Sequence, residues 1–250
     1  MSRIVKWSLL GLLAYLVFLI VKLPASQVVH RINHSNEVVI SDVRGTIWNA
    51  TASLLIVNNV AIERVSWKTS FWSLLVGNVT LDIKGGNLRA SDKVSVQGPV
   101  TISLFDPTHI RASDLNIYVP ANMVIAQVTL PVTVDAGGRF KIQIKELDYH
   151  QACVTLEGKG QWLNAGIEGL GEPLELGNFD ADLSCIENDI LVRIKPPNIF
   201  NLSADARVPM NLAVSVNGRF KPDDSLPKQV KDAANFFGRP DADGFYNIKL

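Results

Sequence analysis

Hydrophobic and polar residues alternate along much of this chain. The alternation is clearest from Val79 to Lys84, where Val79, Leu81 and Ile83 are separated by polar residues. Similar runs occupy residues 38–42, 54–58, 94–100, 117–119, 140–144, 190–194, 212–216 and 245–250. Successive side chains of a strand point to opposite faces, so each run places its apolar residues on one face. The pattern predicts a mainly β protein with an antiparallel sheet, one face of which meets a core.

Clusters of turn-forming residues separate these runs. They are Gly85-Gly86-Asn87, Asp106-Pro107, Ala136-Gly137-Gly138, Glu187-Asn188-Asp189 and Asn217-Gly218. Glycine and asparagine tolerate the positive φ that tight turns between antiparallel strands require. We therefore expect a turn at each cluster and a highly twisted sheet, curled into a half-barrel or folded as a sandwich.

Helical patterns are few. Near the C-terminus, Val230, Ala233 and Phe237 recur at helical spacing after Pro227, and Gly238 is placed to end the helix. Shorter helices are expected at residues 71–76 and 121–127. We expect the C-terminal helix and the last strand to close the sheet.

An apolar stretch lies near the start of the chain. Residues 7–21 carry no charge, and residues 4–23 provide the roughly 20 residues that a membrane span needs if Lys6 and Lys22 extend towards the membrane surfaces. A cleaved signal peptide has a similar core, but Leu23 and Pro24 stand where small residues precede a cleavage site. We favour an uncleaved transmembrane helix.

The charges around this stretch predict the orientation of the chain. Arg3 and Lys6 precede it, and such charges stay on the cytoplasmic side. Residues 1–3 are then cytoplasmic, and residues 24–250 form an exported β-rich domain. A weak echo between residues 45–50 and 160–165, each with a glycine followed by a tryptophan, suggests two related halves of about 24–135 and 136–250.

Cys153 and Cys185 are the only two cysteines. Outside the cytoplasm an isolated pair most often forms a disulfide, here closing a loop of about thirty residues and worth roughly 3 to 4 kcal/mol in the chain-entropy model. Two buried free thiols are the alternative. A metal site is not expected, because no CxxC or HxxxH set lies nearby.

The amino-acid composition is that of a folded protein without an excess of basic residues. With 47% hydrophobic and 19% charged residues, the chain can bury a core. Its 24 Lys and Arg balance 24 Asp and Glu, and no basic stripe appears. Nucleic acid is therefore not an expected partner.

No catalytic motif is present. The sequence lacks a GxSxG elbow, a Walker loop, an HExxH motif and a GxGxxG turn. The four histidines, His30, His34, His109 and His150, are scattered. His30 and His34 would share a helix face, but a zinc site needs three or four ligands. We expect no enzyme activity, no cofactor, no metal and no small-molecule substrate.

Three groups of acidic residues are interpreted as polar surface. Asp241-Ala242-Asp243-Gly244 resembles the start of a calcium loop, but the closing glutamate is missing, so we expect a polar turn before the last strand. Asp180 with Asp182, and Asp223 with Asp224, are expected to be neighbouring acids on an exposed face rather than an acid and base pair.

Four tryptophans outside the N-terminal stretch need a role. Trp48, Trp67 and Trp162 lie in strand-like contexts and are expected in the core. Trp72 belongs to Phe71-Trp72-Ser73-Leu74-Leu75, an apolar surface that either packs on the sheet or contacts a partner. The candidate partner contacts are Phe71, Trp72, Leu74 and Leu75.

Several short segments, spread along almost the whole chain, are similar to those of a known protein family. They are Leu23-Pro24-Ala25, residues 43–48, Val65-Ser66-Trp67-Lys68, residues 74–77, Cys153 with residues 158–162, Cys185, and residues 237–246. In their order and spacing the chain resembles the type II secretion system protein N family. Asn49 stands where that family's pattern would have a small residue. The glycines and tryptophans of these family-like segments are expected to be structural: Gly45, Trp48, Trp67, Gly77, Trp162, Gly238 and Gly244.

The resemblance implies a single-pass cell inner-membrane protein of the general secretion pathway. Its periplasmic domain would act as a scaffold or interaction module in the export of folded proteins across the outer membrane. The implied partners are other inner-membrane and periplasmic components of the machine, and the resemblance brings no catalytic residues.

Two other classes remain open from the sequence. Long alternating strands behind one helix also resemble AsmA-like proteins, whose curved sheets shelter acyl chains, which would make this a lipid-handling or bridge-like protein with an apolar groove. A periplasmic hydrolase would need converging carboxylates that the sequence does not reveal.

Overall fold

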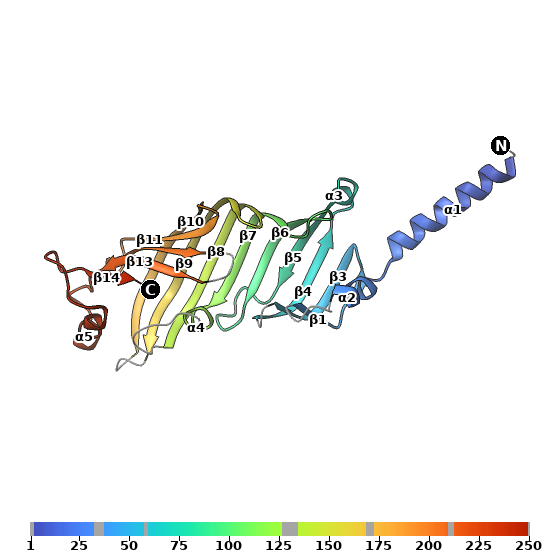
Figure 1. Cartoon of the computed structure of the whole chain (residues 1–250). Helices are drawn as coiled ribbons and strands as arrows, with labels where there is room; N and C mark the ends of the chain where they lie inside the picture. The colour runs from blue at the N-terminus through green and yellow to red at the C-terminus, as the bar shows by residue number, and fades with distance from the viewer. Residues whose placement is uncertain are drawn as a thin grey trace.

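Strands dominate the structure, a computed structural model that describes residues 3–32, 38–57, 60–126, 135–168, 173–209 and 213–249. Within these ranges the strands form one antiparallel sheet of fourteen strands (Figure 1). Each strand pairs with the next along the chain, except that β1 and β2 both pair with β3. The strands are β1 (Val38–Ser41), β2 (Arg44–Thr46), β3 (Asn49–Val57), β4 (Val60–Thr69), β5 (Asn78–Gly85), β6 (Ser95–Ser103), β7 (His109–Pro120), β8 (Asp135–His150), β9 (Cys153–Glu168), β10 (Leu174–Ile186), β11 (Asp189–Lys195), β12 (Ser203–Val208), β13 (Ser215–Phe220) and β14 (Tyr246–Lys249).

The helices of the described structure lie at the ends and edges of the sheet, and all except α1 are short. They are α1 (Arg3–Lys22), α2 (Ala25–Ile32), α3 (Phe71–Leu75), α4 (Ala121–Ile125), α5 (Lys228–Ala234) and the 3-10 helix η1 (Asn235–Phe237). The predicted helices near residues 71–76, 121–127 and the C-terminus are confirmed, although Gln127 lies outside the described residues. Helix α2 was not predicted. It starts after Pro24, and its Ala25 and Val29, four residues apart, are buried.

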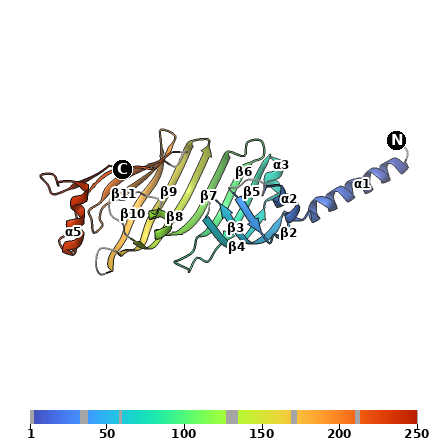
Figure 2. The same ribbon diagram turned by 60° about the horizontal axis from the view of Figure 1, so that its bottom comes forward.

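Helix α1 projects from one end of the sheet, and α5 lies at the opposite end (Figures 1 and 2). The prediction of a helix over residues 4–23 is confirmed, and that of a membrane span is not. In the part of the chain that the structure describes, no helix is both long enough and apolar enough to cross a membrane.

The sheet is a single open layer, so the sandwich was a wrong expectation. Figures 1 and 2 show its strands twisting progressively from β1 to β14. The predicted closing helix is present: Leu226 and Val230, before and within α5, pack against Ala165, Leu176 and Phe179 of β9 and β10. These five buried residues form the main hydrophobic core, at the C-terminal end.

Three of the five predicted turns are confirmed. Gly86 follows β5, Asp106-Pro107 lies between β6 and β7, and Glu187 and Asn188 connect β10 to β11 with φ of 49° and 77°. The positive φ at both residues matches a tight hairpin turn, which asparagine favours at position 188 and glutamate does not favour at position 187.

Two predicted turns are wrong, because their glycines lie inside strands. Gly218 lies in β13, where a Cβ would approach the Cβ of Ala204 to 2.5 Å, so glycine lets β12 and β13 come close. Gly137 and Gly138 lie in β8, at an irregularity in its pairing with β9. The run at residues 212–216 is likewise a strand only from Ser215, and Leu212 lies outside the described residues.

One sheet runs through both predicted halves, and the relation between the halves stays a prediction. The glycine and tryptophan echo does not mark equivalent positions, because Trp48 lies in the turn between β2 and β3 whereas Trp162 lies within β9. The expectation that Trp48 lies in a strand was therefore wrong. The runs named from the sequence also omitted β2, β4, β9, β10 and β12.

Candidate interaction surface

An exposed apolar surface forms at one end of the sheet, where α3 meets the loop between β6 and β7. Trp72 is 76% exposed and Phe105 is 88% exposed. We call this surface the apolar corner. Its six exposed residues are Phe71, Trp72, Leu75, Val76, Leu104 and Phe105.

Gly77 brings the two segments of the apolar corner together. Its φ is +76°, and a Cβ there would lie 2.2 Å from Cε2 of Phe105, so the Phe105 ring occupies the space a side chain would take. The Leu104 N–H donates to the Gly77 carbonyl oxygen at 2.9 Å. Only glycine combines this φ with this contact.

The sequence identified part of the apolar corner. Of the predicted partner contacts, Phe71, Trp72 and Leu75 are exposed, whereas Leu74 is half-buried. Leu104 and Phe105 were missed because they lie about thirty residues away in the sequence. The available signal was two large apolar residues directly before the Asp106-Pro107 turn.

Trp48 connects the apolar corner to α1. Its indole Nε1 donates to the Ile20 carbonyl oxygen at 3.0 Å, and its ring centre lies 5.6 Å from that of Phe71. On either side, the Ile47 N–H donates to the Leu23 carbonyl oxygen at 3.0 Å, and the Thr69 N–H donates to the Trp48 carbonyl oxygen at 2.9 Å. Trp48 thus joins the last turn of α1 to the start of α3.

The other predicted structural residues lie along the sheet. Trp67 is half-buried in β4 between Ala50 and Ile83 of the neighbouring strands. Trp162 lies between Phe140 and Phe179, with ring centres 5.4 and 5.5 Å away, and donates to the Gly137 carbonyl oxygen. This aromatic row crosses the sheet and continues through Phe200, Phe220 and Tyr246.

Two of the predicted glycines lie outside strands and helices, since Gly238 follows η1 and Gly244 precedes β14, whereas Gly45 is the middle residue of β2. The Asp241 carboxylate accepts hydrogen bonds from the N–H groups of Asp243 and Phe245. The segment therefore forms the polar turn expected before the last strand.

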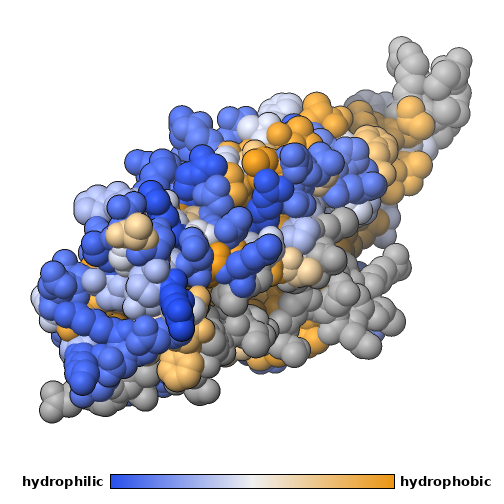
Figure 3. All heavy atoms as spheres, turned by 60° about the vertical axis from the view of Figure 1, so that its left-hand side comes forward, coloured by the Kyte–Doolittle hydropathy of each residue, from blue (hydrophilic) through white to orange (hydrophobic). Residues whose placement is uncertain are grey.

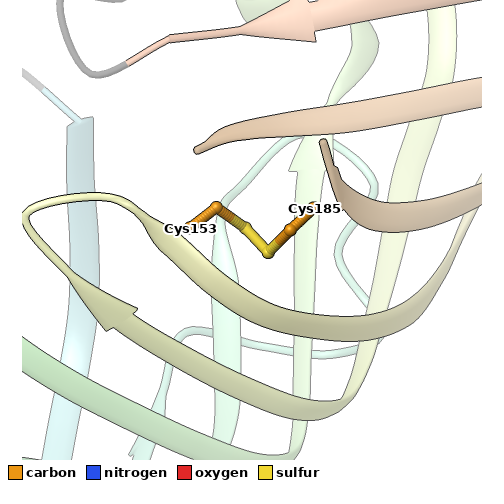
Figure 4. The surroundings of a disulfide bond; sticks show 2 residues. All are labelled: Cys153 and Cys185. Carbon is orange, nitrogen blue, oxygen red and sulfur yellow. A yellow bond between two sulfur atoms is a disulfide. The ribbon is translucent and has the colours of Figure 1, made fainter. Parts of the chain in front are cut away.

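Cys153 and Cys185 form a disulfide between β9 and β10 (Figure 4). Cys153 is buried, and its N–H donates to the Asn188 carbonyl oxygen at 2.8 Å. The regular pairing of β9 with β10 ends at Gly158 and Leu183. The disulfide therefore holds the two strands together beyond the point where their hydrogen bonds end.

Two histidines that the sequence presented as scattered lie together at the end of β7 and β8. His109 pairs with His150, and their rings are stacked 5.1 Å apart. His109 Nε2 lies 3.0 Å from Asp148, and His150 Nε2 lies 2.7 Å from Asp106. The N–H and hydroxyl that Thr108 donates to Asp106 lower the pKa of this carboxyl, and His150 adds to the effect.

Within the described ranges, no group of three or more His, Cys, Asp or Glu side chains is arranged to hold a metal ion. His30 lies in α2, and His34 lies outside the described residues.

The acidic pairs occupy polar surface, as expected. Asp180 and Asp182 are both exposed on β10, where Asp180 accepts a hydrogen bond from Gln161 and Asp182 pairs with Lys195. That partner lowers the pKa of Asp182. Asp223 accepts from the N–H and hydroxyl of Ser225, which lower its pKa and order the loop before α5.

Comparisons with known proteins cover almost the entire chain. The family model described as "Type II secretion system (T2SS), protein N" matches residues 36–249. The type II secretion system protein N of Aeromonas hydrophila is 26% identical over 254 residues, covering 100% of this chain and 98% of the relative. That of Vibrio cholerae is 25% identical over 252 residues, covering 98% and 97%. No solved structure matches. The lipid-handling alternative is not favoured by these matches.

Proposed function

We propose that this chain, which belongs to the type II secretion system protein N family, is an inner-membrane component of that system whose β-sheet is a periplasmic interaction module. The observation that carries the proposal is the family match over residues 36–249, which contain every strand of the sheet. The relatives match over nearly their full length, which supports a proposal for the whole chain rather than for one part of it.

The surface of α1 supports a membrane location. Its side chains from Leu9 to Val21 are almost all large and apolar, and they are exposed around the helix. Figure 3 shows hydrophilic side chains over most of the C-terminal end and hydrophobic ones gathering towards the end that carries α1. Soluble proteins rarely leave so large an apolar surface in water, and lipid would cover it. We therefore propose that α1 lies in the bilayer, although by length and hydropathy it does not qualify as a membrane span within the described residues.

Two features support a periplasmic sheet. Arg3 and Lys6 favour a cytoplasmic N-terminus by the positive-inside rule, which leaves the sheet on the other side. The Cys153–Cys185 disulfide fits an oxidising compartment, because disulfides rarely persist in the cytosol.

The open sheet suits a protein that binds other proteins. In the described structure one edge is formed by β1 and β2, which both pair only with β3, and the other edge by β14, which pairs only with β13. The outer side of such a strand offers unpaired backbone groups to an added strand. No motif for catalysis is present in the sequence, so we propose contact with other components of the machine rather than chemistry.

A secretion assay combined with crosslinking tests this function. In a strain that lacks the chain, we expect a cargo of the system to accumulate in the periplasm, and the full chain to restore its release into the medium. A photoactivatable amino acid in place of exposed Val154 on β9, or of Asn247 on β14, should capture another component of the system. Normal secretion without the chain, together with no captured secretion component, would contradict the proposal.

Alkaline phosphatase fused after Leu250 provides the test of orientation, because it folds to an active enzyme only outside the cytoplasm. We expect high activity. Low activity, with the matching green fluorescent protein fusion bright, would place the sheet in the cytoplasm.

A further inference from the structure

We propose that the apolar corner docks onto the surface of the lipid bilayer beside α1, giving the sheet a second contact with the membrane. The inference rests on the proposed membrane location of α1 and goes beyond it. It identifies the occupant of a surface formed by Phe71, Trp72, Leu75, Val76, Leu104 and Phe105.

The connection between α1 and the sheet leaves little freedom for the sheet to move away. Only Leu23 and Pro24 separate α1 from α2, and both are fixed: the Leu23 carbonyl accepts the Ile47 N–H, and Pro24 forms a β-bridge with Thr46. The end of α1 is therefore held against the turn between β2 and β3. If α1 lies in the bilayer, this end of the sheet lies at the membrane surface.

The apolar corner lies beside that attachment. Trp48 contacts the last turn of α1 through the Ile20 carbonyl, and Phe71 is the next ring along. The ring centres of Trp48 and Phe71 are 5.6 Å apart, and those of Phe71 and Trp72 are 5.7 Å apart. The centre of the Trp72 ring therefore lies within about 11 Å of the centre of the Trp48 ring. The polar headgroup layer of a bilayer is about 6 Å thick, so the length of this layer and one side chain together is similar to that distance. Figures 1 and 2 show α3 at the end of the sheet from which α1 projects.

The chemistry of the apolar corner fits this position. Tryptophan and phenylalanine are taken up at the boundary between headgroups and acyl chains, where aromatic rings anchor proteins that lie on a membrane. The corner joins three exposed aromatic side chains to three exposed aliphatic ones, and Phe105 and Trp72 are the most exposed large hydrophobic residues of the described structure. Its continuity with α1 through Trp48 favours lipid over a protein partner.

Fluorescent labels on the full chain test the inference in vesicles of phosphatidylethanolamine and phosphatidylglycerol. Both native cysteines form the disulfide, so a single added cysteine can be labelled with the environment-sensitive dye NBD. The variants are Trp72→Cys and Phe105→Cys in the corner, Leu13→Cys within α1, and Phe236→Cys as the matched control. Phe236 is 68% exposed and lies at the far end of the sheet.

We expect lipids with a doxyl group near the headgroup to quench the labels at positions 72 and 105 several-fold more than the label at 236. Position 13 lies near the middle of α1, so its label is tested with lipids that carry the doxyl group deep in the acyl chain. Quenching at position 13 by these lipids, with no quenching above the control at 72 and 105, would overturn the inference and leave α1 in the membrane. No quenching at position 13 by these lipids would overturn the membrane location of α1, and the docked corner with it.

A charge substitution and a crosslinker separate lipid from protein as the occupant. Trp72→Asp should reduce the quenching of a label at position 105 several-fold, whereas Phe236→Asp should leave it unchanged, with circular dichroism confirming an intact sheet. In cells, a photoactivatable residue at position 72 should capture phospholipid. Capture of a secretion component at that position, instead of lipid, would overturn the inference.

Discussion

The disulfide offers a quantitative test of how the second half of the sheet is held together. Cys153 and Cys185 join β9 to β10 beyond Gly158 and Leu183, where regular pairing ends. Replacing both cysteines with alanine removes the link and adds no polar group at the buried position of Cys153. We expect the variant to keep its fold, because the aromatic row and the α5 contacts lie elsewhere on these strands.

The expected loss of stability follows from the length of the closed loop. The two cysteines are 32 residues apart in sequence. In the chain-entropy model such a link lowers the entropy of the unfolded chain by about 12 cal/mol/K, or about 3.7 kcal/mol at 25 °C. With a urea m value of about 2 kcal/mol per M, the unfolding midpoint should fall by about 1.8 M.

Urea titration of the full chain in a mild detergent measures this shift by tryptophan fluorescence. The parent protein with reductant should approach the double variant, and the variant itself should not respond to reductant. A midpoint that changes by less than about 0.3 M in both comparisons would refute the view that the disulfide restrains the unfolded chain.

Three further predictions use urea titration on the same full chain. Phe179→Ala should cost about 3 to 5 kcal/mol, because Phe179 is buried between aromatic rings under α5; a loss below about 1 kcal/mol would contradict that core. Gly77→Ala should lower the free energy of unfolding by about 1 to 3 kcal/mol more than Gly177→Ala, because only a side chain at position 77 displaces Phe105. Gly177 is the matched control, since its φ of +77° is nearly the same and the space around it is open. Equal losses of stability would contradict a role for the ring contact. The Asp106 pKa is lowered in the folded state, so its contribution to stability is present above the unfolded pKa of 3.8 and is lost as the pH falls through the folded pKa. Asp106→Asn should therefore flatten the decline of stability below about pH 4, and an unchanged slope would contradict this.

The sequence predicted the class of fold well where the local pattern decides the structure. Period-two alternation identified strands such as β5, because one face of each meets apolar neighbours. It failed for β9 and β10, where Gly158, Gly160 and Gly177 interrupt the apolar positions while the backbone still pairs on both sides. Pairing with two neighbours overrides weak local propensity.

Turn residues were harder to interpret, because glycine has two uses in a sheet. At Glu187 and Asn188 a positive φ was required, and only Asn188 is of a residue type that indicates it. At Gly218 the requirement was the close approach of Ala204 on the neighbouring strand, which no local pattern reveals. Asn217-Gly218 therefore has the same sequence signature as a hairpin turn and lies in the middle of β13.

The candidate surface shows the same limit on a larger scale. Phe71 and Trp72 belong to a short cluster of apolar residues in the sequence, so local sequence sufficed to predict their helix. Phe105 joins it only because Gly77 leaves room for the ring, and α1 adjoins it only because Trp48 lies in a turn rather than a strand. Each contact links residues at least 23 positions apart, and antiparallel pairing of β3 to β6 brings them to one end of the sheet. When strand pairing brings distant segments together into one surface, the sequence therefore predicts the separate segments but not the surface that they form. Here the contacts of Trp48 and Gly77 join those segments into one site.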